Sequence, residues 1–262
     1  MSKYILLTGF LLLLPLIALA SELTDRGDQA YQTEHYSDAI ALYLEAMERD
    51  GTSSDLYYNL GNAYYRSGQI ADAILSYERA LRLDPTNSEA RANLAFVNER
   101  IVDKKGESGS FLSNAVTSVV NKSSSNGWAY LALTFFIIAA AGVAAYLFFD
   151  SVLIRKTGFF GGIIAAILFV ICLIFSINAK SLAEDTSDAV ITAETSVLST
   201  VPRAPMTREE EALLLHKGTR VKILRSMPLP GDSTQVWHEV AVDNNNRAWI
   251  NNDDIARIIE KK

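Results

Sequence analysis

The sequence predicts a multi-domain membrane protein with three structured parts: an all-α repeat region, a transmembrane hairpin of two helices, and a small all-β domain. Three observations lead to this fold class. Residues 128–149 and 158–177 carry no charged side chain, residues 21–103 repeat with a period of 34, and short β-type runs follow residue 188. Together these features account for most of the chain.

The two uncharged runs are long enough to cross a membrane. At about 1.5 Å per residue, each makes a helix of roughly 30 Å, the thickness of the hydrocarbon core of a bilayer. A core helix of a soluble protein is seldom apolar on every face, so a buried soluble hairpin is the weaker alternative. We predict transmembrane helices at 128–149 and 158–177, joined by a cytoplasmic loop at 150–157. Because neither run contains an ionisable acid or base, we expect an anchor rather than an ion path.

Residues 1–20 have the pattern of a secretory signal peptide. A positive start and an apolar stretch precede Ala18-Leu19-Ala20, which matches the small-x-small site of signal peptidase. We predict cleavage after this site, and an uncleaved signal anchor is the alternative. In either case the following residues are exported, and two crossings return the chain to the same side. The soluble parts before and after the hairpin should therefore share the extracytoplasmic space, with Arg155 and Lys156 in the cytoplasmic loop.

Residues 54–87 carry the pattern aromatic-x-x-Leu-Gly-x-x-Tyr, followed by Ala, aromatic, Ala and Pro. The matching positions are Tyr57, Leu60, Gly61, Tyr64, Ala73, Tyr77, Ala80 and Pro85. This pattern resembles the tetratricopeptide (TPR) repeat, in which small residues let two helices approach and aromatic rings fill the space around them. A weaker copy occupies residues 20–53, and residues 88–102 are similar to a capping helix. We therefore predict a TPR domain at 21–103.

The TPR resemblance implies a concave groove, lined by the first helix of each repeat, that holds a segment of a partner protein. The matching positions here are Asp28, Tyr31, Tyr58, Asn59, Asn62, Tyr65, Arg66, Glu89, Asn93 and Phe96. Asp28 and Glu89 stand where a clamp for a partner's C-terminal carboxylate would need an amide or a cation. Residues 21–103 contain seven Arg, no Lys and fifteen Asp or Glu, a net charge of −8, so a basic or neutral partner fits better. The alternative role of these side chains is to stabilise so short an array.

Residues 104–127 are predicted to be a linker that contains a short amphipathic helix at 111–121. Apolar residues recur there at nearly helical spacing, which is typical of a helix on a membrane surface. A loosely ordered linker is the alternative.

The C-terminal part, residues 188–262, is predicted to be a small all-β barrel. Candidate strands lie at 189–192, 197–200, 219–224, 236–242 and 248–251, and residues 202–215 look like a long inserted loop. Lys217-Gly218-Thr219, Trp237 and Trp249 give this part a resemblance to the bacterial SH3-like domains. The resemblance implies a groove that Trp237 and Trp249 could line, although tryptophans in such domains more often lie in the core.

The sequence shows no motif for catalysis or metal binding. The three histidines lie in different segments, the only cysteine is Cys172, and there is no P-loop, dinucleotide-binding turn or nucleophile motif. The net charge of −6 and the pI near 5.2 argue against a nucleic-acid partner. We therefore expect no enzyme activity, no cofactor and no bound metal.

Across the full chain, the order of parts is similar to that of the BatE-like TPR proteins of the bacterial aerotolerance (Bat) operon. The resemblance implies a multi-pass protein of the bacterial inner (cytoplasmic) membrane with both soluble parts in the periplasm. It also implies protein partners, the membrane-anchored von Willebrand A-domain Bat proteins, a cytoplasmic MoxR-type ATPase alongside them, and a role in oxidative or envelope stress tolerance. The predicted function is a non-catalytic scaffold that gathers partners through the TPR groove and the SH3-like domain. The alternative is a cell-wall tether whose SH3-like domain binds peptidoglycan.

Overall fold

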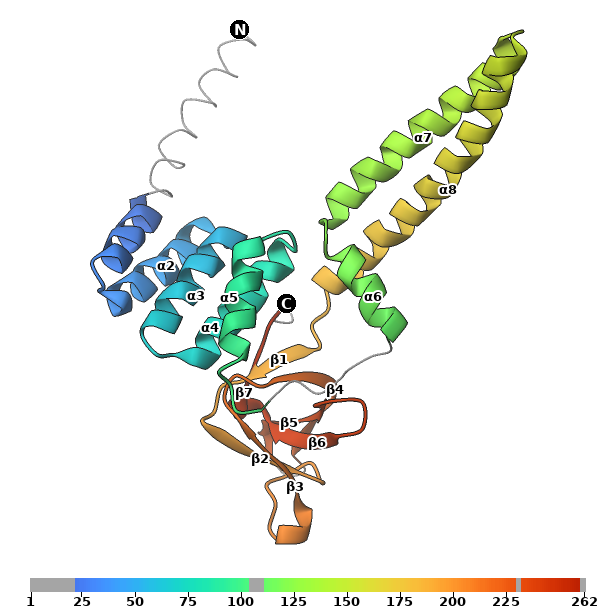
Figure 1. Ribbon diagram of the computed structural model, residues 1–262. Coiled ribbons are helices and arrows are strands. Elements are labelled where there is room, and N and C mark those ends of the chain that lie inside the picture. The colour runs from blue at the N-terminus through green and yellow to red at the C-terminus, as the bar shows by residue number, and fades with distance from the viewer. Residues whose placement is uncertain (1–21, 104–110, 230–231, 260–262) are drawn as a thin grey trace, which may run out of the picture. The chain divides into compact units, whose positions relative to one another are not determined.

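The computed structural model describes residues 22–103, 111–229 and 232–259 (Figure 1). Contacts divide the chain into two units. The first unit contains the N-terminal helices and the C-terminal sheet, and the second contains the helices between residues 109 and 185. The signal peptide expected at residues 1–20 lies outside the described residues, as do residues 104–110 of the expected linker.

The first unit begins with a run of short helices. These are a helix at residues 22–32, α2 (Tyr36–Asp50), α3 (Ser54–Arg66), α4 (Ile70–Leu83) and α5 (Ser88–Asn98). The side chains of Ser53 and Asn87 cap α3 and α5, because each accepts a hydrogen bond from the backbone N–H three residues later (3.1 and 2.8 Å). Gly51, with a φ of 91°, follows the end of α2. These local signals set where the helices begin and end.

Two glycines let the helices of each pair approach closely. A Cβ on Gly61 would lie 2.7 Å from the ring of Tyr77, and a Cβ on Gly27 would lie 2.5 Å from the ring of Tyr43. Both tyrosines are almost fully buried, at 1% exposure. The same contact therefore recurs after 34 positions, as the sequence period predicts.

The C-terminal part of the first unit is an antiparallel sheet of seven strands. Its strands are β1 (Asp188–Ile191), β2 (Thr195–Ser199), β3 (Glu211–His216), β4 (Arg220–Leu229), β5 (Asp232–Ala241), β6 (Arg247–Asn251) and β7 (Ile255–Arg257). They are ordered β3-β2-β6-β5-β4-β1-β7. Short 3₁₀ turns, η1 (Arg208–Glu210) and η2 (Asn252–Asp254), precede β3 and β7. One face buries a cluster that includes Ile191, Leu198, Val240 and Ile250.

Two strands were not predicted. Residues 202–215, expected to be an inserted loop, contain most of β3, which pairs with β2 along its length. Its Ala-Leu-Leu-Leu sequence has no β-branched residue, so the strand depends on its partner rather than on local propensity. The three-residue β7 is too short to show an alternating pattern. The sheet is therefore larger than the five strands expected.

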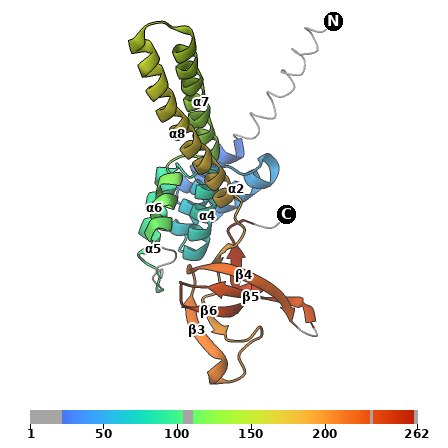
Figure 2. The same cartoon turned by 90° about the vertical axis from the view of Figure 1, so that its right-hand side faces the viewer.

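The helices and the sheet of the first unit lie next to each other (Figures 1 and 2), and they share a core. Val190 of β1 and Ile258 pack in the same buried cluster as Ile74 and Tyr77 of α4. A Cβ on Gly218 would lie 2.9 Å from the Ile74 side chain, so the turn before β4 also approaches α4 closely. The repeats and the C-terminal part, expected as separate modules, form one packed unit.

The second unit consists of α6 (Phe111–Val120), α7 (Ser125–Phe148) and α8 (Val152–Ala183). By length and composition, α7 and α8 could each cross a membrane, and little of their apolar surface is buried. The two helices meet at glycines: a Cβ on Gly142 would lie 2.6 Å from the carbonyl oxygen of Gly158 and 2.8 Å from Cα of Gly162. At the other end of the hairpin, Trp128 Nε1 donates to the carbonyl oxygen of Val120 (2.9 Å) and so caps α6.

The loop expected at residues 150–157 is shorter in the structure. Helix α8 begins at Val152, so Arg155 and Lys156 lie in its first turns. No glycine or proline interrupts residues 152–157, so the helix begins before the uncharged run that starts at Gly158.

Candidate partner-binding groove of the repeats

The predicted groove residues of the first repeat form a hydrogen-bonded cluster. Asp28 Oδ1 accepts from the Tyr43 hydroxyl (2.6 Å) and from Asn59 Nδ2 of the next repeat (3.2 Å). Burial, together with the adjacent Asp28 carboxylate, raises the pKa of Tyr43 far above its usual value. The Tyr43 hydroxyl therefore remains a donor at physiological pH, and Asp28 is held between two helices.

The same cluster recurs 34 positions later. Asn62 Oδ1 accepts from the Tyr77 hydroxyl (2.7 Å) and from Asn93 Nδ2 of α5 (2.8 Å). Together the two clusters form a ladder that joins the first helices of successive repeats. The predicted groove residues Asp28, Asn59, Asn62 and Asn93 therefore hydrogen-bond within the ladder, which fixes the spacing between the first helices of successive repeats.

An exposed aromatic surface lies at the end of the ladder. The rings of Tyr65 and Phe96 meet edge to face with centroids 5.9 Å apart. The Arg100 guanidinium lies 4.3 Å from the Phe96 ring centroid and hydrogen-bonds the Tyr65 hydroxyl. Phe96 is nevertheless 47% exposed. We call these three residues the Tyr65–Phe96–Arg100 surface. It exposes an apolar ring beside a cation.

A second arginine stacks on an aromatic ring in the first repeat. The Arg66 guanidinium lies 4.8 Å from the Tyr36 ring centroid and 3.7 Å from the Glu34 carboxylate, and Tyr36 also meets Tyr31 at 5.5 Å. Sequence reasoning included Arg66 but missed Arg100. The 34-residue spacing between these two arginines was the signal that could have found it.

The remaining predicted site residues are placed differently. Tyr58 is half-buried, with its ring 6.3 Å from that of Tyr77, and Glu89 is exposed in the first turn of α5, where its charge favours the helix. Trp237 and Trp249 are only 5% and 6% exposed. Their rings are therefore largely covered by the rest of the chain, and a groove between them stays a prediction.

Among residues 22–103, 111–229 and 232–259, no group of three or more His, Cys, Asp or Glu is arranged to hold a metal ion. The three histidines lie apart. His238 is 2% exposed and holds Ser226 and Asn252 through its two ring nitrogens (2.7 and 2.9 Å). This satisfies the polar atoms of a buried ring.

Comparisons with known proteins identify the helical part. The family model described as tetratricopeptide repeat matches residues 54–87, and one described as TPR repeat matches residues 27–68. Residues 27–87 are TPR repeats. A similar solved structure is the crystal structure of the Sgt2 TPR domain from Aspergillus fumigatus, with 19% identity and a TM-score of 0.30. The match covers 63% of this chain and 80% of that chain. The comparison with curated proteins gave no match. TPR repeats are typically non-catalytic modules that bind other proteins.

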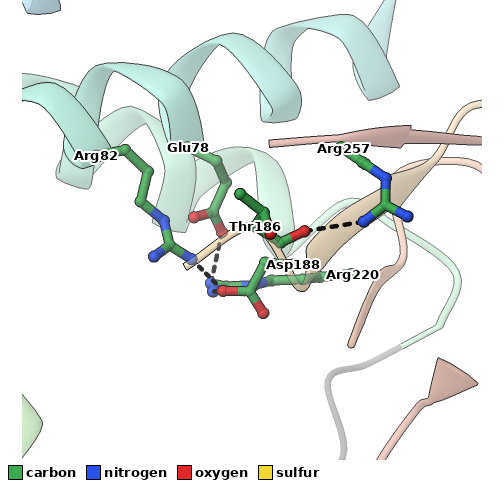
Figure 3. A network of polar contacts seen from close by, with 6 residues as sticks. All are labelled: Glu78, Arg82, Thr186, Asp188, Arg220 and Arg257. Carbon is green, nitrogen blue, oxygen red and sulfur yellow. Dashed lines mark hydrogen bonds and ion pairs between the residues drawn. The ribbon is translucent and has the colours of Figure 1, made fainter. Parts of the chain in front are cut away.

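A network of ion pairs joins the sheet to α4 of the TPR repeats (Figure 3). Arg220 of β4 lies between Glu78 of α4 (2.9 Å) and Asp188 of β1 (2.8 Å), and Arg82 of α4 pairs with Asp188 as well. Burial alone would lower the pKa of Arg220, but the carboxylates of Glu78 and Asp188 outweigh burial and raise the pKa above its usual value. The guanidinium therefore stays charged. The network therefore joins the repeats to the sheet.

A second polar contact joins the end of the helical region to the sheet. The Asp103 carboxylate accepts from the backbone N–H of His216 (2.6 Å) and from the Thr219 hydroxyl (2.8 Å), and it also lies 3.2 Å from His216 Nδ1. Burial alone would raise the pKa of Asp103, but these hydrogen bonds outweigh it and lower the pKa below its usual value. The carboxylate is therefore ionised in the folded chain.

Proposed function

We propose that this protein is a membrane-anchored, non-catalytic adaptor whose TPR groove binds a partner protein. The Tyr65–Phe96–Arg100 surface is the observation that carries the proposal. Its neighbours in the groove are engaged in the ladder, which holds the surface rigid, while the Phe96 ring remains half-exposed. A rigid aromatic anchor next to an arginine is typical of the residues that dominate protein interfaces.

The chemistry of the partner follows from the charge around this surface. The net charge of −8 over residues 21–103 favours a segment that carries Lys or Arg. The segment should also present an apolar side chain to Phe96. It need not end in a carboxylate, since the groove holds Asp28 and Glu89 where a carboxylate clamp would place an amide or a cation.

Membrane anchoring by α7 and α8 is the second part of the proposal. The shared core of Ile74, Val190 and Ile258 supports it, because the repeats and the sheet must fold in the same compartment to form that core. Two crossings meet this condition, as would none, and a single crossing does not, so the shared core bears on the number of crossings and the length of α7 and α8 on anchoring itself. Arg155 and Lys156 at the hairpin turn favour a cytoplasmic turn and a periplasmic first unit.

The cellular role rests on the order of parts, which is similar to that of BatE-like proteins. We propose that the partners include the von Willebrand A-domain Bat proteins of an inner-membrane complex that supports aerotolerance or envelope stress tolerance. The SH3-like assignment of the sheet remains a prediction. Because Trp237 and Trp249 are buried, their rings do not favour binding to peptidoglycan over binding to protein.

Photo-cross-linking in cells tests the adaptor function. A photoreactive phenylalanine analogue at Phe96 should capture a membrane-protein partner. The same analogue at Leu44, an apolar residue of similar exposure on α2 (40% against 47%), is the matched control and should not. Capture at neither position, or equal capture at both, would overturn the proposal. Retention of the purified chain on cell-wall sacculi would instead favour the wall-tethering alternative.

A further inference from the structure

An apolar groove runs along the hairpin between α7 and α8. It has a volume of about 570 Å³. The large side chains that line it are Phe136, Val143, Tyr146, Phe159, Ile163 and Phe169. Gly142, Gly158 and Gly162 add no side chain to its floor, so the groove is a hollow in an otherwise bulky surface. Its chemistry suits a hydrocarbon chain.

A smaller pocket with two cations adjoins this groove near the hairpin turn. The pocket shares Tyr146 and Phe159 with the groove and adds Arg155 and Lys156. The Arg155 guanidinium lies 5.0 Å from the Tyr146 ring centroid, which directs it toward the boundary of the two cavities. Among the described residues, no carboxylate pairs with Arg155 or Lys156.

The first turn of α8 adds a further preference for an anion. The helix begins at Val152, and the side chain of Ser151 does not cap it. Free backbone N–H groups at a helix start attract negative charge, and cations are unfavourable there. The first turn contains no acidic residue, and Asp150, which precedes it, forms no ion pair with either cation. An anion in this pocket would satisfy the N–H groups and both side chains at once.

We propose that this end of the hairpin binds an anionic phospholipid. The phosphate lies at Arg155, Lys156 and the start of α8, and one acyl chain lies in the groove between α7 and α8. A single ligand with both chemistries fits the two cavities, because Tyr146 and Phe159 line both of them. This inference rests on the proposed membrane anchoring and adds the class of lipid at the hairpin turn.

Native mass spectrometry of the full chain tests the site. The chain is mixed in detergent with equal amounts of phosphatidylglycerol and phosphatidylcholine that carry identical acyl chains. The wild type should retain phosphatidylglycerol preferentially. One cation near an anionic lipid contributes roughly a fivefold preference, so R155Q/K156Q should lower the preference by about thirtyfold. The matched variant K122Q/K180Q removes the same charge outside the pocket and should keep the wild-type preference.

Three outcomes would overturn the site. An equal loss of preference in R155Q/K156Q and K122Q/K180Q would show that only the net charge of the chain matters. An unchanged preference in R155Q/K156Q would exclude the two cations. Displacement of the lipid by excess inorganic phosphate would show an anion site without an acyl chain in the groove. Extraction of membranes with alkaline carbonate distinguishes failure of the lipid site from failure of the proposed membrane anchoring. Release of the wild type would refute the anchoring. Both double variants should stay in the membrane pellet.

Discussion

Replacing Arg220 with alanine should destabilise the first unit by about 3 kcal/mol. The side chains of Arg220, Glu78 and Asp188 are 30%, 10% and 13% exposed, and the guanidinium joins a helix of the repeats to two strands of the sheet. Removing one partner of a buried ion pair costs about 3–5 kcal/mol, because it leaves the other charge uncompensated. Asp188 would keep Arg82, so the lower end of this range applies.

Urea unfolding of the full chain in detergent micelles measures this effect. The fluorescence of the buried Trp237 and Trp249 reports unfolding of the sheet. With a slope of about 2 kcal/mol per molar urea, the midpoint should fall by about 1.5 M. R49A is the matched control, because the Arg49–Glu45 pair on α2 is 44% and 51% exposed. It should cost less than about 0.5 kcal/mol.

A double variant sharpens the test. E78L/R220M removes both charges of one pair and replaces them with apolar side chains, so it should be more stable than R220A. If R220A instead unfolds at the same urea concentration as R49A, the ion pairs between α4 and the sheet do not form in solution. The reasoning that the repeats and the sheet are one folded unit would then be wrong.

Other contacts of the first unit give further predictions. G61A should lower stability by about 2 kcal/mol, since its Cβ would lie 2.7 Å from the Tyr77 ring; an unchanged thermal midpoint would contradict this packing. Y43F should cost more than Y77F in the same assay, because only the Tyr43 hydroxyl donates to a carboxylate, that of Asp28. Equal losses of stability in Y43F and Y77F would argue against a stronger hydrogen bond at Tyr43. D103N should be less stable than the wild type at pH 7, and the gap should close below about pH 4. The folded pKa of Asp103 is lowered, so its stabilisation is present above the unfolded pKa and is lost as the pH falls through the folded pKa. A gap that stays constant down to pH 3 would refute this.

The repeats could be predicted because their contacts are local. Gly61 and Tyr77 are 16 positions apart within one repeat, so a fixed spacing records their packing. Two apolar helices could likewise be predicted, since a run without charges needs no long-range information. The groove residues were identified from the same period, but their hydrogen bonds to one another were not, because a residue type alone does not reveal its partner.

The contact between the repeats and the sheet could not be predicted. Glu78 and Arg220 are 142 positions apart, and Arg82 and Asp188 are 106 positions apart, so no spacing rule relates them. Strand β3 was missed for a similar reason, because its leucines become a strand only beside β2. Both failures concern structure that is determined by distant partners rather than by local pattern.

Labelling of single cysteines in intact cells tests the topology most directly. In a chain whose Cys172 is replaced by serine, new cysteines at Glu45 of the repeats and at Met206 of the sheet region (79% exposed) are compared with one at Ser151 in the hairpin turn. A membrane-impermeant thiol reagent added outside the cytoplasmic membrane should label the first two positions, and should label Ser151→Cys only after the membrane is opened. Labelling of the repeats and the sheet from opposite sides would contradict the two-crossing anchor and the shared core together.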